Sequence, residues 1–171
     1  MLKHNNIIAG IFFLAAFISL NDQIHSQDSG KPRLIVTTDI GGDPDDQQSL
    51  VRLFLYLNEF RLEGIIVSAA GTTGELGVDT LRPDLVYNII RGYSQVYNNL
   101  SFTDKTYPKP SYLESIVKKG NPHRGYTSVG EGHDTEGSEW IVKRMCETSS
   151  DPLHISIWGG STDLAQALWN V

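Results

Sequence analysis

The sequence predicts an α/β domain built on an open, mostly parallel, Rossmann-like sheet with helices on both faces. Three apolar, β-branched runs have the length of strands and occupy residues 33–38, 62–70 and 153–158. A segment of helical periodicity follows each run, and this alternation of strand and helix is typical of parallel sheets. Ligands of such sheets bind at the carboxyl ends of the strands, so the turns after the three runs are expected on one rim.

The first two helices are predicted from the spacing of apolar residues. Asp45 and Asp46 open a pattern that places the apolar residues of 50–57 on one face, and acidic side chains in a first turn suit the helix dipole. A second helix is expected over residues 82–98. Prolines then break the chain, and a short helix restarts at Ser111, which forms a Ser-x-x-Glu capping box with the residue three positions on.

The second half of the chain contains a long loop and two more helices. Residues 120–132 are rich in Gly, Pro and His and are predicted to form a loop long enough to line a site. His123 and Arg124 in this loop are expected to be exposed to solvent, with contact to a ligand as the alternative. A helix is expected over 138–146, with Asp134 or Thr135 as its N-cap.

The last predicted helix follows the third strand. Ser161 or Thr162 caps it, and its pattern continues to Val171 without a Gly or a polar tail to close it. A sheet of about three strands also leaves an edge that a longer chain would cover. We therefore expect residues 33–171 to be the N-terminal part of a larger domain.

Composition excludes several classes of protein. The length of 171 residues is typical of one domain, and 14 Lys and Arg against 20 Asp and Glu give a net charge of −6, which argues against a nucleic-acid partner. Cys146 is the only cysteine, so an intrachain disulfide and a cysteine-based zinc cluster are excluded. We expect this cysteine to be a small buried residue.

The first residues resemble an export signal rather than part of the fold. Residues 1–26 combine a short positive end, an apolar run and a polar stretch, which predicts a signal peptide, and residues 27–32 form a polar linker before the domain at 33–171. The alternative is an uncleaved N-terminal anchor, although the apolar run is short for a membrane span. A secreted or periplasmic protein with no stable membrane span after cleavage is expected.

Four carboxylates lie within eight residues at the end of the first predicted strand. They are Asp39, Asp43, Asp45 and Asp46. Such close negative charges raise one another's pKa unless a cation lies among them, and oxygen ligands beside a glycine turn favour a hard ion such as Ca²⁺. Neither an EF-hand nor a P-loop fits this spacing. The alternative is that these side chains only cap and charge the start of a helix.

The acidic turn resembles the N-terminal signature of the nucleoside hydrolases, Ca²⁺-dependent N-ribohydrolases with a DTDPGxDD turn. Asp39 matches the catalytic Asp of that signature, and Asp45 and Asp46 match its final Asp pair, provided that two extra residues are accommodated here. The segments 64–71 and 157–165 are similar to the second strand and to the TGPLTNIA segment of the family. The wording TDIGGDPDDQQSLVR looks closer to a divergent branch, the nucleoside-hydrolase-like domain of secreted bacterial cellulose-binding proteins.

The resemblance implies roles for individual residues. Asp39 would be the general base and a calcium ligand, Asp46 a calcium ligand, and the backbone carbonyl of Trp158 a further ligand. Asp45 would bind sugar hydroxyls, and Thr72 stands where the family has an Asn that binds the ribose. Asp43 belongs to the insertion and inherits no role.

Two functions remain open on this reading. The first is calcium-dependent hydrolysis of an N-glycosidic bond in a nucleoside or related small carbohydrate. The second is a non-catalytic carbohydrate-binding module, with cellulose or another polysaccharide as partner. The departures from the signature favour the second function, whereas Asp39 with the pair 45–46 favours the first.

Overall fold

The computed structural model describes residues 30–69 and 80–171. Within them, four parallel strands form one sheet in the order β3-β2-β1-β4. The strands are β1 (Arg33–Thr38), β2 (Arg61–Val67), β3 (Val117–Lys119) and β4 (Leu153–Ile157). The three predicted strands are confirmed, and β3 was not predicted. The predicted signal peptide at 1–26 and Thr72 lie outside the described residues.

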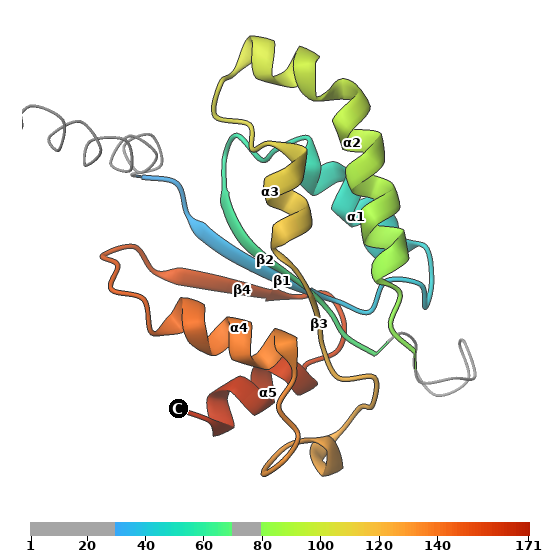
Figure 1. Cartoon of the computed structure of the whole chain (residues 1–171), viewed down its shortest axis with the longest axis vertical. Coiled ribbons are helices and arrows are strands. Elements are labelled where there is room, and N and C mark those ends of the chain that lie inside the picture. Colours follow the sequence, from blue (N-terminus) through green and yellow to red (C-terminus); the bar gives the residue numbers. More distant parts are fainter. Residues whose placement is uncertain (1–29, 70–79) are drawn as a thin grey trace, which may run out of the picture.

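Helices cover both faces of this sheet, as the sequence predicts (Figure 1). On one face lie α1 (Asp45–Phe54), α2 (Pro83–Thr103) and α3 (Pro110–Ser115), and on the other lie α4 (Glu136–Met145) and α5 (Thr162–Trp169). A short 3₁₀ helix, η1 (Tyr126–Ser128), interrupts the loop before α4.

Strand residues supply apolar side chains alternately to the two faces. Val36 and Ile65 pack in the larger core beneath α1, α2 and α3, whereas their neighbours Ile35 and Ile66 pack against α4 and α5. All four side chains are fully buried. Burial of each such side chain contributes about 1.5–3 kcal/mol, and a strand buried on both faces reads as a continuous apolar run rather than an alternating one.

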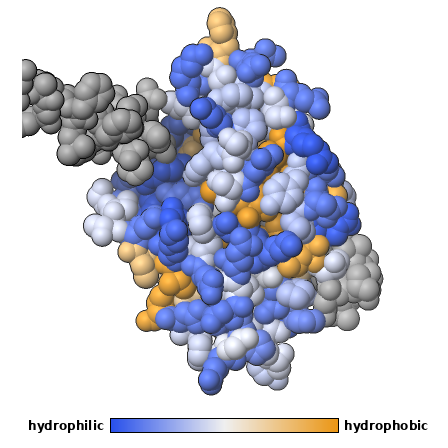
Figure 2. Space-filling model, viewed as in Figure 1, coloured by the Kyte–Doolittle hydropathy of each residue, from blue (hydrophilic) through white to orange (hydrophobic). Residues whose placement is uncertain are grey.

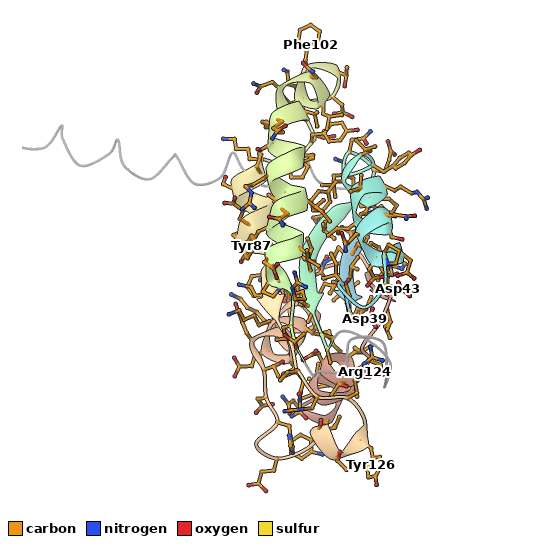
Figure 3. The ribbon with its side chains drawn as sticks, turned by 90° about the vertical axis from the view of Figure 1, so that its right-hand side faces the viewer. Asp39, Asp43, Tyr87, Phe102, Arg124 and Tyr126 are labelled. Atoms are coloured by element: carbon orange, nitrogen blue, oxygen red, sulfur yellow. The ribbon has the colours of Figure 1, made fainter. Side chains whose placement is uncertain are left out.

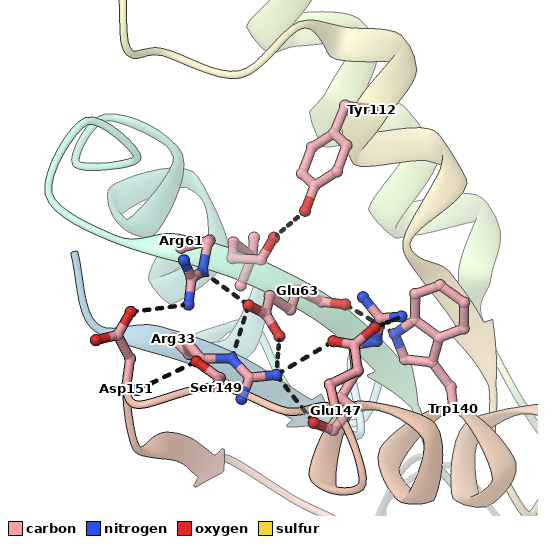
Figure 4. Close-up of polar contacts among 10 residues, drawn as sticks. Arg33, Arg61, Glu63, Tyr112, Trp140, Glu147, Ser149 and Asp151 are labelled. Atoms are coloured by element: carbon pink, nitrogen blue, oxygen red, sulfur yellow. Dashed lines mark hydrogen bonds and ion pairs between the residues drawn. The ribbon is translucent and has the colours of Figure 1, made fainter. Parts of the chain in front are cut away.

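The amino ends of the strands are joined by an ion-pair network (Figure 4). Arg33 donates to both oxygens of Glu63 at 2.9 and 2.8 Å, and both side chains are buried. The register between β1 and β2 skips Glu63, whose carbonyl accepts a 2.7 Å hydrogen bond from the indole of Trp140. Arg61 adds a 2.9 Å contact to Glu63 and reaches Asp151. The opposite, carboxyl ends of the strands are thereby left for the polar residues described below.

Several local predictions need correction. The capping box at Ser111 is wrong: Pro110 occupies the first turn of α3 after Lys109, so Ser111 already lies inside the helix and caps nothing. Proline suits that position because its fixed φ is helical and its missing N–H needs no partner there. Cys146 is exposed rather than buried, and it forms the C-cap of α4. The last helix ends at Trp169, and its N-cap Ser161 makes no side-chain cap bond.

The helix expected over 82–98 extends further, to Thr103, whereas the predicted N-cap of α4 is confirmed. Thr135 is the N-cap of α4. Its hydroxyl accepts a 2.9 Å hydrogen bond from the Ser138 N–H, and the Ser138 hydroxyl accepts a 2.9 Å hydrogen bond from the Thr135 N–H.

The surface seen in Figure 2 is mostly hydrophilic, with apolar side chains confined to small areas. In the part of the chain that the structure describes, no helix is long and apolar enough to cross a membrane.

Candidate functional site

The strand order reverses at β1, which pairs with β2 on one side and with β4 on the other. From β1 the chain proceeds through β2 to β3 on one side, and β4 then pairs with the other side of β1. Ligands of open α/β sheets bind at such a reversal of strand order. Asp39 follows β1 directly, and the Trp158 N–H beyond β4 donates a 2.9 Å hydrogen bond to the Thr37 carbonyl. The acidic turn therefore lies where the fold favours a ligand.

The side chain of Asp39 points towards the end of β4. A Cβ atom added at Gly159 would lie 2.1 Å from the Asp39 Cγ, so the carboxylate occupies the space that any other residue at position 159 would fill. The turn after Asp39 closes through a 3.2 Å hydrogen bond from the Gly42 N–H to the Asp39 carbonyl. Figure 3 shows Asp39 and Asp43 on the same side of the molecule.

Asp46 lies in the first turn of α1 and is buried against the end of β1. Its Oδ2 atom accepts hydrogen bonds from the Thr38 hydroxyl at 2.5 Å and from the Asp39 N–H at 3.1 Å. Only 5% of the residue is exposed. These bonds and the positive end of the helix dipole fix the carboxylate beside Asp39.

The environment of Asp46 favours its neutral form. The pKa of Asp46 is raised to about 6, chiefly by burial and also by the negative charges of Asp39 and Asp45, whereas the hydrogen bond from Thr38 opposes the shift. A positive charge placed between the two carboxylates would relieve both unfavourable effects.

Arg124 meets Asp39 from the loop at 120–132. Its Nη2 atom lies 2.6 Å from the Asp39 Oδ2 atom, and its Nη2 and Nε atoms also donate to the Ala69 carbonyl at 3.1 and 3.3 Å. The expectation of a solvent-exposed side chain is therefore wrong for Arg124, which is only 32% exposed, and right for His123. The contact depends on the tertiary fold, which brings this loop to the carboxyl ends of the strands beside Asp39 (Figure 3).

Asp163 is a second residue at this rim to which sequence reasoning gave no role. It is fully buried in the first turn of α5 and accepts from the Ser68 hydroxyl at 2.6 Å, the Thr135 hydroxyl at 2.7 Å and the Asn121 N–H at 2.9 Å. The available signal was its place in the segment 157–165, which carries part of the family resemblance.

The remaining predicted site residues are placed less closely. Asp45 is exposed, and its Oδ1 atom accepts a 2.7 Å hydrogen bond from the Asp46 N–H. Asp43 is exposed, and its Oδ1 atom accepts a 3.3 Å hydrogen bond from the Asp45 N–H. A hydrogen-bonding contact with Asp43 lowers the pKa of Asp45. The structure brings Asp39, Asp46 and the end of β4 together and leaves Asp45 at the surface.

The donor set fits a hard cation in part. Asp39 and Asp46 offer carboxylate oxygens close to each other, which is the ligand type that calcium prefers. Among residues 30–69 and 80–171, no group of three or more His, Cys, Asp or Glu side chains is arranged to hold a metal ion. These residues thus supply two carboxylates, and Arg124 supplies one positive charge beside them.

Comparison with known proteins shows the family of the chain and agrees with its fold. Residues 33–171 match the family described as "Cellulose-binding Sde182, nucleoside hydrolase-like domain". A solved structure, a nucleoside hydrolase-related protein from Saccharophagus degradans that is associated with carbohydrate metabolism, is 42% identical and superposes with a TM-score of 0.75. The match covers 83% of this chain and 34% of that one, so this chain spans about a third of the solved protein. A search of the curated proteins gives no significant match.

Proposed function

The chain belongs to the family of Sde182-type nucleoside hydrolase-like domains, and we propose that it hydrolyses the N-glycosidic bond of a nucleoside or related sugar conjugate. One observation supports this proposal above the others. Two carboxylates, Asp39 and Asp46, lie side by side at the carboxyl end of β1, where the strand order reverses.

In this proposal Asp39 is the general base. Its carboxylate takes a proton from water, and the water oxygen forms a bond to the anomeric carbon of the sugar. The bond from that carbon to the nucleobase nitrogen breaks, and its electron pair leaves with the nitrogen. The leaving nitrogen gains a proton from solvent. Asp45, exposed on the first turn of α1, would bind sugar hydroxyls.

Calcium is proposed as the cofactor of this site. Asp39, Asp46 and the Trp158 carbonyl would hold it, and a bound calcium ion would lower the pKa of the attacking water. The Thr38 hydroxyl and the Asp39 N–H keep the Asp46 carboxylate in place by occupying its Oδ2 atom.

Turnover with and without a chelator tests the proposal. The full chain is incubated with a panel of ribonucleosides in Ca²⁺ and in EGTA, and release of the free base is measured. Release that EGTA abolishes and added Ca²⁺ restores would support hydrolysis. If no nucleoside is cleaved in Ca²⁺ by a chain that unfolds cooperatively, the catalytic proposal is wrong.

A second function, carbohydrate binding without turnover, is favoured by the position of Arg124. Its guanidinium takes the Asp39 Oδ2 atom, one of the two oxygens that a base or a metal ligand would use. The description of the family as cellulose-binding agrees with that role. Depletion of the chain from solution by insoluble cellulose, in Ca²⁺ and in EGTA, distinguishes the two functions when it is measured beside nucleoside cleavage.

A further inference from the structure

The loop that carries Arg124 is held against the sheet by buried anchors. The Asn121 N–H donates to both oxygens of Asp163, at 2.9 and 3.1 Å, and the Asn121 side chain donates to the Ser128 carbonyl at 3.2 Å. Asn121, Ser128 and Asp163 are all buried. The base of the loop is thus fixed on both sides of Arg124.

A second anchor holds the end of the loop. The side chain of Gln166, on α5, accepts from the Gly130 N–H at 2.7 Å and donates to the Gly130 carbonyl at 3.1 Å. Gln166 is 1% exposed. A buried amide that satisfies both backbone groups of one residue holds that residue at a defined position.

Arg124 itself bridges two strand ends. Its guanidinium contacts the Asp39 carboxylate, which follows β1, and the Ala69 carbonyl, which follows β2. Both side chains of the ion pair are partly buried: 32% of the Arg124 side chain and 24% of the Asp39 side chain are exposed. The planar guanidinium can satisfy both acceptors at once, which a lysine ammonium cannot do with the same geometry. This arrangement is an element of the site rather than a chance surface pair.

We propose that Arg124 is a built-in counter-ion of the candidate site, which neutralises Asp39 and competes with a divalent cation for its carboxylate. The inference rests on the proposed function, because it concerns how calcium enters that site. Calcium that uses the Asp39 Oδ2 atom must displace the guanidinium, and it must also approach a fixed positive charge. Ca²⁺ affinity is therefore lower than the carboxylates alone would give.

Calcium titration of two variants tests this inference without any measurement of turnover. Arg124→Gln removes the positive charge, and Arg91→Gln removes an exposed positive charge from α2, far along the chain from the acidic turn, as the matched control. Isothermal titration is run at low salt on wild type and both variants, after circular dichroism shows that each is folded. Arg124→Gln is expected to bind Ca²⁺ about tenfold or more tightly than wild type, and Arg91→Gln about as wild type does.

Arg124→Lys extends the test, because it keeps the charge and loses the bridging geometry. Its affinity is expected to lie between those of wild type and Arg124→Gln. Equal or weaker Ca²⁺ binding by Arg124→Gln overturns the competition while leaving the calcium site of the proposed function intact. Absence of binding in all the proteins overturns both the competition and the calcium site.

Discussion

The hydroxyl of Ser68, just beyond β2, donates a 2.6 Å hydrogen bond to the carboxylate of Asp163 in the first turn of α5. Two glycines, Gly120 and Gly160, pack closely against these two side chains. A Cβ atom at Gly120 would lie 2.1 Å from an Asp163 oxygen, and one at Gly160 would lie 2.4 Å from the Ser68 Cβ. The Asp163 carboxylate also accepts hydrogen bonds from the Thr135 hydroxyl and the Asn121 N–H. It therefore connects the end of β2, the loop at 120–132 and the starts of α4 and α5.

Asp163→Asn is therefore expected to destabilise the chain. The amide of the variant keeps one acceptor oxygen and replaces the other with an NH₂ group, which cannot accept a hydrogen bond. The buried donors that now bond to that second oxygen would lose their acceptor, so the free energy of unfolding should fall by about 2–4 kcal/mol. Urea unfolding followed by circular dichroism measures the change. Asp84→Asn, an exposed carboxylate paired with Arg82 on the surface, is the control and should change the stability by less than about 0.5 kcal/mol. Equal effects of the two substitutions would show that the Asp163 bonds add nothing.

The sequence predicts those parts of the site that depend on neighbours along the chain. Asp39 and Asp46 are seven residues apart across one turn, so a strand that ends at Thr38 and a helix that begins at Asp45 bring them together without help from elsewhere. The alternation of strand and helix likewise predicts the parallel sheet and its two helical layers.

The contacts that the sequence missed join residues far apart in the chain. Arg124 is 85 residues from Asp39, and Asp163 is 95 residues from Ser68. Nothing in the local pattern around Arg124 distinguishes it from a loop cation in solvent. Strand β3 was missed for a related reason, since three residues with two lysines carry no periodic signal, and its pairing with β2 is a tertiary contact.

Stability should depend on pH through Asp46. The carboxyl of an unfolded Asp titrates near pH 4, about its ordinary value, whereas in the folded chain the pKa of Asp46 is about 6. Between these values the folded state holds a proton that the unfolded state has lost, so the contribution of Asp46 to stability falls as pH rises from about 4 to 6 and is constant above. A shift of roughly two units corresponds to about 3 kcal/mol.

Asp46→Asn isolates that contribution. Its side-chain oxygen can still accept from Thr38 and from the Asp39 N–H, but it carries no charge. In EGTA the variant should become more stable relative to wild type as pH rises from 4 to 7, by up to about 3 kcal/mol. Urea unfolding at several pH values measures the difference. A difference that does not change with pH would mean that the pKa of Asp46 is not raised.

The same substitution should weaken calcium binding. Loss of one of two carboxylates removes a charged oxygen ligand, so Asp46→Asn is expected to bind Ca²⁺ at least about tenfold more weakly than wild type. Isothermal titration provides the measurement, and Asp43→Asn, an exposed carboxylate of the same turn, is the control with nearly unchanged affinity. Unchanged affinity in Asp46→Asn would place the calcium elsewhere.

Asp39→Asn should remove hydrolysis while sparing the fold. The amide keeps the volume of the side chain beside Gly159 but is not a base, so nucleoside cleavage should fall by about 100-fold or more. Circular dichroism and thermal unfolding should remain close to wild type. Asp43→Asn again provides the control, with cleavage at the wild-type rate. Retained cleavage in Asp39→Asn would assign the base to another residue.

Gly159→Ala tests the position of Asp39 without altering any carboxylate. The added Cβ would lie 2.1 Å from the Asp39 Cγ, so the carboxylate must move, while the backbone at 159 suits any residue. A displacement of about 1 Å can reduce turnover by about 100-fold. The stability cost should stay near 1–2 kcal/mol, because the short Asp39 side chain at the rim can shift more easily than a packed core can.

Gly92→Ala, in α2 with nothing within 4 Å of the added atom, is the matched control and should keep full cleavage, with a gain in stability of up to about 1 kcal/mol. Since both variants add the same methyl group, wild-type cleavage and calcium affinity in Gly159→Ala would show that the observed place of Asp39 is not the one that functions.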